Sequence, residues 1–279
     1  MLIGCLKGRP VAVDGGDAFD LSELLDEPRA APGAGRMLQL AQEWPRVHTS
    51  LARRGTGHLP EAGDAAGAGW GPPMPRPPKI VGAALNYRAH AEEMQAGPTV
   101  ETGGLFLKAS SSVVGPGATV LLPFADRRTD QEAELGVVIG RPARHVDAGD
   151  ALDHVLGYTC LLDISVRGEG DRSIRKSFDT FTPIGPFLAT PETVGDPGAL
   201  RLRCWVGDEL RQDGSTSELL RSVPELIAEI SAAMTLEPGD VIATGTPAGV
   251  GPLAPGDRIA VEIERVGRLE VDVDVGYRG

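Results

Sequence analysis

The chain has 279 residues, which is enough for one large domain, or a large and a small one, with a core that needs no disulfide. Its net charge of −12 at pH 7 argues against nucleic acids and anionic membranes as partners. No apolar run has the length of a signal peptide or a membrane span. The three cysteines are far apart and form no zinc or disulfide pattern, so we expect a cytoplasmic protein.

The first part of the chain predicts a small domain. Residues 1–26 are typical of short strands joined by turns, with the start of a helix or a turn at Leu21–Leu25, and 37–54 have the apolar spacing of a helix. Residues 63–78 are dense in Ala, Gly and Pro, a composition that we expect to form a linker without regular elements. We therefore predict a small domain over 1–70 and a larger domain over 71–279.

The larger part predicts a mainly β domain of the α+β class with a few helices. Two of its apolar runs, 132–140 and 155–164, are typical of buried strands. Helices are predicted at 87–95, before a stop at 97–98, and at 224–234. The other predicted strands cover 80–85, 104–110, 119–122 and 241–243, with a last hairpin of 258–266 and 269–275 around Gly267.

Two carboxylates mark the start of the first buried run. Glu132 and Glu134 are two positions apart, so an extended strand would point both side chains to one face. Their repulsion requires a nearby cation or a retained proton. Asp163 ends the second buried run and would complete an all-oxygen site suited to Mg²⁺. The alternative is that Glu132 and Glu134 are solvated acids on an edge strand.

Three further places carry candidate chemistry. His90 and Glu93 lie three residues apart on a predicted helix, where the carboxylate would orient the imidazole as a general base; a solvated helix surface is the alternative. Lys176 lies in a polar loop, either as a stabiliser of an oxyanion beside the metal or as a solvated lysine. The glycine-rich turn 243–251 could bind a carboxylate or carbonyl through its backbone and Thr246, or serve as a structural turn.

Six ordered motifs from about residue 79 onward resemble the fumarylacetoacetate hydrolase family. The segment 85–93 is similar to its NY-x-x-H-x-x-E motif, and 130–135 is similar to its E-x-E-L strand. The other four matches are the segments 105–108 with 115–117, Gly157-Tyr158 with Asp163 and Arg167, 176–180, and 244–247. Six motifs in order are far more specific than any one of them.

The resemblance implies a rolled mixed β-sheet with a small N-terminal domain, in a homodimer. It implies that Glu132, Glu134 and Asp163 hold Mg²⁺ or Mn²⁺. It implies His90 with Glu93 as the base that activates water, with Lys176 as a third catalytic group. The substrate contacts that it implies are Thr246, Arg167 and Lys108, and Thr180 would border the metal site together with Lys176.

The family resemblance implies cleavage of a C–C bond in an acylpyruvate or another β-dicarbonyl, through an enolate that the metal stabilises. The same parts fit decarboxylation, isomerisation, or hydration and dehydration of a 2-oxo dicarboxylic acid such as oxaloacetate. A non-catalytic binding protein is a further alternative. One departure concerns the substrate: the family usually continues R-D-x-Q after the arginine, whereas this chain has Gly168 and Gly170 in place of the acid and the amide. Ala109 replaces a common proline.

Overall fold

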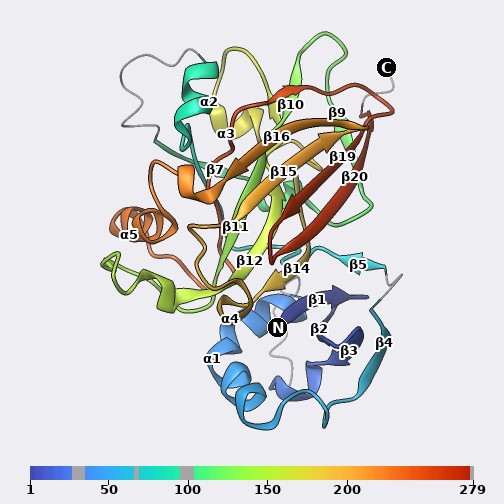
Figure 1. Ribbon diagram of the computed structural model, residues 1–279, viewed down its shortest axis with the longest axis vertical. Coiled ribbons are helices and arrows are strands. Elements are labelled where there is room, and N and C mark those ends of the chain that lie inside the picture. The colour runs from blue at the N-terminus through green and yellow to red at the C-terminus, as the bar shows by residue number, and fades with distance from the viewer. Residues whose placement is uncertain (27–34, 66–68, 95–103, 277–279) are drawn as a thin grey trace.

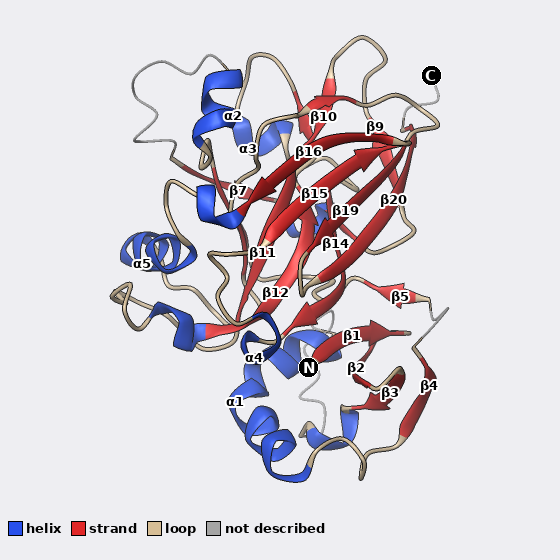
Figure 2. Ribbon diagram, in the orientation of Figure 1, coloured by secondary structure: helices blue, strands red, loops and turns tan. Residues whose placement is uncertain are grey.

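The computed structural model describes residues 1–26, 35–65, 69–94 and 104–276. Strands dominate it, and they form a twelve-stranded, a five-stranded and a three-stranded sheet (Figures 1 and 2). The mainly β class predicted from the sequence is therefore confirmed. The largest core cluster lies between the long sheet and the five-stranded sheet, and a second cluster lies under the helix α1 (Arg36–Arg54).

The N-terminal strands belong to the long sheet. β1 (Leu2–Leu6) pairs antiparallel with β14 (Thr182–Ala189), and β2 (Arg9–Asp14) and β3 (Asp17–Asp20) continue the sheet outward. The predicted short strands and the helix are confirmed, with a single 3-10 turn at Ser22–Leu24. The first residues thus extend the main sheet at one end of the molecule (Figure 1).

One prediction for this region is wrong. The Ala/Gly/Pro-rich segment contains two regular elements: β4 (Glu61–Asp64) runs into it, and β5 (Trp70–Gly71) lies inside it. β4 pairs with β3, and β5 pairs with β1. Composition failed here because strand pairing uses backbone groups, which small residues also supply at a sheet edge. Gly4 leaves room for the ring of Trp70, because a Cβ there would lie 2.5 Å from it.

The centre of the long sheet carries the two predicted buried strands. β11 (Ala133–Ile139) and β12 (Val155–Leu162) pair antiparallel and are buried throughout. β11 also pairs with β17 (Val241–Ala243), which runs parallel to β6 (Ile80–Ala83), and β7 (Leu105–Lys108) closes this end. Because both faces are covered, these strands are continuous apolar runs.

The five-stranded sheet covers one face of that centre. Its order is β16 (Glu209–Ser215), β15 (Arg201–Val206), β19 (Arg258–Ile263), β20 (Gly267–Val275) and β9 (Thr119–Leu122). The predicted last hairpin is confirmed, although its turn lies just before Gly267. The sequence analysis missed β14, β15 and β16: prolines interrupt β14, arginines interrupt the apolar residues of β15, and β16 is mostly charged and polar.

Short elements complete the fold. The predicted helices are confirmed as α2 (Arg88–Glu93) and α5 (Val223–Ala233), whereas the predicted end of the first one at 95–98 lies outside the described residues. No helix in the described ranges is long and apolar enough to cross a membrane. The remaining elements are α3 (Arg172–Arg175), α4 (Pro191–Val194), β8 (Val113–Val114), β10 (Thr129–Gln131), β13 (Ser165–Val166), β18 (Gly251–Pro252) and 3-10 turns at Ser110–Ser112, Ala151–His154 and Thr216–Glu218.

Candidate metal centre and active site

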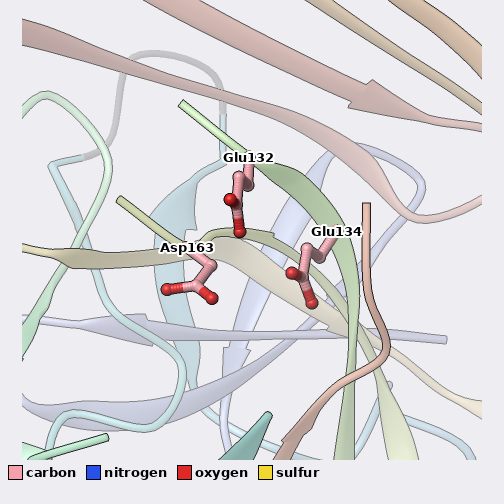
Figure 3. Close-up of side chains that lie close together, drawn as sticks. All are labelled: Glu132, Glu134 and Asp163. Atoms are coloured by element: carbon pink, nitrogen blue, oxygen red, sulfur yellow. The ribbon is translucent and has the colours of Figure 1, made fainter. Parts of the chain in front are cut away.

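Three buried carboxylates meet where the central strands begin and end. Glu132 lies between β10 and β11, Glu134 is in β11, and Asp163 follows β12. The backbone N–H of Asp163 donates to the carbonyl of Glu132 at 2.8 Å, which holds the two strand ends together. One oxygen from each carboxylate lies within 4.8 Å of the others (Figure 3). The predicted convergence of Glu132 and Glu134 on one face is therefore confirmed.

Two lysines offset this negative charge. Nζ of Lys176 lies 2.7 Å from Oε2 of Glu132 and 2.5 Å from Oδ2 of Asp163, so it bridges two of the three carboxylates. Lys108 contacts Oδ1 of Asp163 and donates to the carbonyl of Phe181 at 3.0 Å. Both ammonium groups are buried, so these ion pairs are poorly screened by water.

The pKa values of Glu132 and Glu134 are shifted in opposite directions. Burial alone would raise the pKa of Glu132, but the charges of Lys176 and Arg167 outweigh it and lower that pKa to about 2. Burial, followed by repulsion from Asp163 and Glu132, raises the pKa of Glu134 well above its usual value. The repulsion foreseen between neighbouring acids is thus relieved both by a cation and by a tendency to keep a proton.

The donor set fits a hard divalent ion. Three carboxylate oxygens within one small buried space match the ligands that Mg²⁺ and Mn²⁺ prefer, and they offer no sulfur or imidazole for a softer metal. Glu134 accepts a 2.7 Å hydrogen bond from the backbone N–H of Gly245, which orients its side chain toward the other two. Glu132, Glu134 and Asp163 are therefore the candidate ligands.

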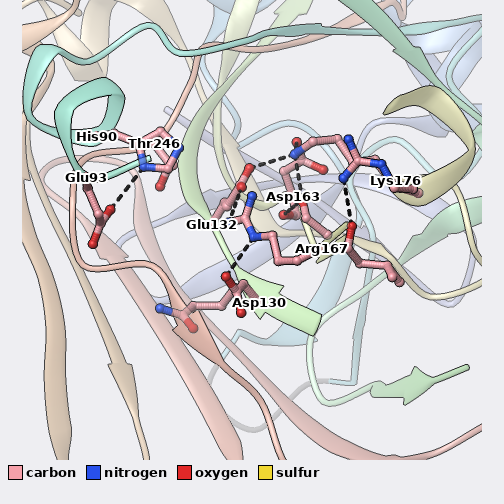
Figure 4. A network of polar contacts seen from close by, with 12 residues as sticks. His90, Glu93, Asp130, Glu132, Asp163, Arg167, Lys176 and Thr246 are labelled. Carbon is pink, nitrogen blue, oxygen red and sulfur yellow. Dashed lines mark hydrogen bonds and ion pairs between the residues drawn. The ribbon is translucent and has the colours of Figure 1, made fainter. Parts of the chain in front are cut away.

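The predicted pair of a histidine and the carboxylate that orients it, His90 and Glu93, forms on α2. Nδ1 of His90 lies 3.2 Å from Oε2 of Glu93, while Oε1 of Glu93 accepts the backbone N–H of Gly249 at 3.1 Å (Figure 4). A carboxylate at Nδ1 favours the tautomer that carries its proton there, which leaves the lone pair on Nε2. His90 is buried, and both residues line the same cavity as the three carboxylates.

This cavity has a volume of about 660 Å³ and is crowded with charge. Its apolar wall includes Phe106, Met94 and Val250. Five carboxylates line it: Glu93, Asp130, Glu132, Glu134 and Asp163. Five cationic side chains line it as well: Arg128, Arg167, Arg172, Arg175 and Lys176. In a chain of net charge −12, such a gathering of arginines is a local feature of the cavity.

A buried aspartate that the sequence analysis missed organises two of the arginines. Asp130 is fully buried in β10 and accepts Nε and Nη2 of Arg128 at 2.7 and 3.0 Å, together with Nε of Arg167 at 2.7 Å (Figure 4). Nη2 of Arg167 then forms an ion pair with Oε1 of Glu132 at 2.7 Å. The signal was available, because Asp130 precedes Glu132 by two positions and so shares its side of an extended segment.

The glycine-rich turn after β17 holds the strand that carries Glu134. Besides the bond from Gly245 to Glu134, the hydroxyl of Thr246 donates to the carbonyl of Ala133 at 2.8 Å and accepts Nε2 of Gln212 at 2.7 Å. Thr246 lines the cavity, but these protein partners use its hydroxyl as both donor and acceptor. The turn therefore has a structural role in addition to any contact with a substrate.

Two of the predicted site residues lie outside the cavity wall. Lys108 is behind Asp163, and it does not line the cavity. Thr180 does not line the cavity either, and its hydroxyl accepts the backbone N–H of Leu121 at 2.8 Å. Its neighbour Phe181 supplies the carbonyl that fixes Lys108. The structure thus gives both residues partners within the protein.

The segment with the two unexpected glycines folds into a tight loop and the short helix α3. Gly168 and Gly170 both have positive φ, 116° and 106°, which a glycine adopts without strain. Arg175 fixes the loop by donating to the carbonyls of Val166 at 2.8 Å and Gly170 at 3.2 Å. The next residue, Lys176, therefore enters the carboxylate cluster from a backbone segment that these hydrogen bonds hold in place.

Known proteins resemble this chain over most of its length. The model of the fumarylacetoacetate hydrolase C-terminal domain matches residues 79–274. A maleylpyruvate hydrolase of Aquipseudomonas alcaligenes is 43% identical over 212 residues, which are 72% of this chain and 74% of that protein. The human mitochondrial oxaloacetate tautomerase is 40% identical over 208 residues, 70% of this chain and 66% of that one.

A solved structure extends the likeness to the whole chain. The maleylpyruvate hydrolase of Sphingobium sp. SYK-6, in complex with manganese and pyruvate, has 38% sequence identity and a TM-score of 0.87. The match covers 99% of this chain and all of that one, so it includes the N-terminal strands.

Proposed function

The chain belongs to the fumarylacetoacetate hydrolase family, and we propose that it is a metal-dependent hydrolase that cleaves a C–C bond in an acylpyruvate-type 2-oxo acid or a related β-dicarbonyl. One observation carries the proposal: the pair of His90 and Glu93 lines the same cavity as the three buried carboxylates. A base beside a metal site is what a hydrolytic attack on a chelating dicarbonyl requires. The maleylpyruvate hydrolases among the relatives support the same chemistry.

In this proposal Glu132, Glu134 and Asp163 hold Mg²⁺ or Mn²⁺. When bound, the ion supplies Lewis acidity that polarises the carbonyls of the substrate and stabilises the enolate that departs. The manganese in the solved maleylpyruvate hydrolase supports a divalent ion of this kind. A product assay with each metal in turn decides between the two.

His90 takes the proton from the attacking water. Glu93 holds its Nδ1, so Nε2 accepts that proton while the water oxygen bonds to the acyl carbonyl carbon. The C–C bond between the acyl carbon and the methylene then breaks, and the bonding electrons leave with the pyruvate fragment as its enolate. The acyl fragment becomes a carboxylic acid, and the enolate regains a proton at its methylene carbon to give pyruvate.

Lys176 adds positive charge beside this reaction. Its ammonium bridges Glu132 and Asp163 and lines the cavity, so it lies next to the place where negative charge develops on the substrate oxygens. Arg167 is the proposed contact for the carboxylate of the 2-oxo acid, since it lines the cavity while Asp130 and Glu132 fix it. Thr246 remains a proposed substrate contact at the cavity wall.

A second candidate is proton transfer or decarboxylation on a 2-oxo dicarboxylic acid such as oxaloacetate. The human oxaloacetate tautomerase among the relatives favours the proton transfer, and the base formed by His90 and Glu93 would serve either reaction. The products separate the candidates: pyruvate plus a second acid means hydrolysis, CO₂ means decarboxylation, and exchange between keto and enol forms means tautomerisation.

The test is a product assay on acetylpyruvate, maleylpyruvate, fumarylpyruvate and oxaloacetate, with Mg²⁺, with Mn²⁺ and with EDTA. We expect metal-dependent release of pyruvate from an acylpyruvate, and its loss in His90→Ala. Turnover of oxaloacetate alone would replace the proposed hydrolase with the second candidate.

A further inference from the structure

A buried glutamine of the five-stranded sheet reaches the candidate metal centre. Gln212 in β16 is fully buried, whereas Leu210, two positions earlier on the same strand, is 46% exposed. In a regular strand both side chains would point to one face, and the apolar one would be expected inside. The register with β15 shifts between Cys204 and Trp205, so Arg211 is an extra residue that pairs with no residue of β15. This bulge turns Gln212 toward the long sheet.

The side-chain amide of Gln212 is held in one orientation. Its Nε2 donates to the hydroxyl of Thr246 at 2.7 Å and to the carbonyl of Pro247 at 2.8 Å. Its Oε1 accepts the backbone N–H of Ala133 at 3.0 Å. Turning the amide over would set its NH₂ group against that N–H, so the hydrogen bonds permit a single arrangement. Gln212 does not line the cavity, and it therefore acts through the residues that it holds.

Ala133 is the residue between the candidate ligands Glu132 and Glu134. On one edge of β11 the strand β12 pairs along its whole length, whereas β17 pairs with the other edge only further along the chain. At Ala133 two side chains take the place of a strand on that second edge. Gln212 accepts the N–H of Ala133, and Thr246 donates to its carbonyl at 2.8 Å. Both peptide groups that join Glu132 to Glu134 are therefore held by side chains.

The strand that carries Gln212 lies directly against the glycine-rich turn. A Cβ on Gly214 would lie 2.8 Å from Cβ of Pro247, and a Cβ on Gly249 would overlap the carbonyl oxygen of Arg211. Glycine at both positions lets the strand and the turn touch. The hydrogen bonds of Gln212 thus anchor the start of β11 to a packed layer, the five-stranded sheet.

We propose that Gln212 is a positioning residue of the candidate metal centre. Together with Thr246 it fixes both peptide groups between Glu132 and Glu134, and so sets the spacing of their carboxylates for a small ion. The proposal rests on the proposed function for the identity of the metal ligands, and it adds a residue outside the cavity that controls how selectively they bind. Mg²⁺ tolerates little departure from octahedral geometry, whereas Ca²⁺ accepts flexible surroundings. Loosening this stretch of β11 therefore affects the smaller ion more.

Binding of Mg²⁺ and of Ca²⁺ to the metal-free protein, measured by calorimetry, tests this role. Gln212→Met keeps an unbranched side chain but removes the amide, which leaves the buried N–H of Ala133 without its acceptor. We expect the affinity for Mg²⁺ to fall about 10- to 100-fold, the range typical of residues that orient metal ligands. The affinity for Ca²⁺ should fall less, so the ratio of Mg²⁺ to Ca²⁺ affinity should drop.

Thr216→Val is the matched control. Thr216 is buried just after the same strand, and its hydroxyl accepts the backbone N–H of Leu200 at 2.9 Å, away from the cavity wall. This variant should unfold at lower urea concentration while both metal affinities stay at the wild-type values. If Gln212→Met does not fold, Thr246→Val carries the test, because it removes the hydroxyl that holds the carbonyl of Ala133.

An unchanged Mg²⁺ affinity in Gln212→Met would overturn the positioning role. An equal fall for both ions, or the same fall in Thr216→Val, would overturn it as well, since either would be a general effect of lost stability. A wild type that binds neither ion would overturn the ligand set itself. These binding data need no turnover, so failure of the hydrolase assay is distinguishable from failure of this proposal.

Discussion

The backbone N–H of Gly245 donates a 2.7 Å hydrogen bond to Oε2 of Glu134, so a turn more than a hundred residues away along the chain orients a candidate metal ligand. Gly245 has a φ of 101°, and a Cβ on it would lie 2.7 Å from Cβ of Asn86. Asn86 is itself fixed by hydrogen bonds to the backbone at Thr244 and Arg221. The backbone of the turn therefore cannot shift without moving Asn86.

Gly245→Ala tests this relationship. We expect a loss of about 1–3 kcal/mol in the free energy of unfolding, from the strained φ and the contact with Asn86. The shift of the N–H away from Glu134 should also weaken Mn²⁺ binding. Urea unfolding and Mn²⁺ titration measure the two effects. Gly256→Ala, at a φ of 89° with open space around it, is the matched control, and it should leave Mn²⁺ affinity unchanged.

His90→Ala and Glu93→Gln separate the base from the residue that orients it. We expect His90→Ala to lower kcat on the best acylpyruvate about 10²- to 10⁴-fold, since it removes the proton acceptor. Glu93→Gln should cost less, because its amide can still contact Nδ1. Mn²⁺ affinity should stay at the wild-type value in both. If Mn²⁺ affinity fell together with kcat, His90 would belong to the metal site instead.

Metal affinity should rise with pH. The pKa of Glu134 is raised by burial and by its neighbours Asp163 and Glu132, so the metal-free carboxyl keeps a proton to a higher pH than usual, and metal binding displaces it. Raising the pH through that pKa removes this competition and tightens binding. Calorimetry in two buffers of different ionisation enthalpy should detect proton release. Glu134→Gln should release no proton and bind Mn²⁺ far more weakly.

Lys108→Met tests whether this lysine contacts substrate or supports Asp163. Because Lys108 lies outside the cavity wall, we expect a loss of stability on the order of 3 kcal/mol from a broken buried pair. Added Mn²⁺ should restore part of that loss, since it brings another positive charge to Asp163. Thermal unfolding with and without Mn²⁺ measures this. An unchanged stability with a raised KM would instead support the substrate contact implied by the family resemblance.

The family resemblance also predicts a homodimer. Light scattering should then give about twice the 29.2 kDa of the single chain. A mass equal to that of one chain at micromolar concentration would contradict the prediction.

The candidate metal ligands could be predicted from the sequence because their signal is local. Period-two spacing put Glu132 and Glu134 on one face, and the helical spacing of His90 and Glu93 made them neighbours. Spacing alone did not place Asp163, since only strand pairing brings it to Glu132. The six motifs indicated that Asp163 belongs to the same site. The domain boundary near residue 70 stays a prediction, although β1 and β14 share a sheet across it.

The other features of the site and of the fold depended on tertiary contacts. The sequence showed four lysines but not that Lys108 lies behind Asp163 while Lys176 faces the cavity. Arg128 and Arg167 meet on Asp130 only after β10 pairs with β13. Likewise, β14 was missed because proline and glycine normally argue against a strand, and here the pairing with β12 and β1 overrides them.

The pairing of β1 with β14 has a practical consequence. A chain cut back to the residues that the family model matches would lose β1, and the backbone groups of β14 from Phe187 to Ala189 would lose their partners. An uncovered strand of this kind readily adds a strand from another molecule. The first seventy residues thus shield the catalytic sheet from self-association, and a truncated form should aggregate even with every residue of the cavity in place.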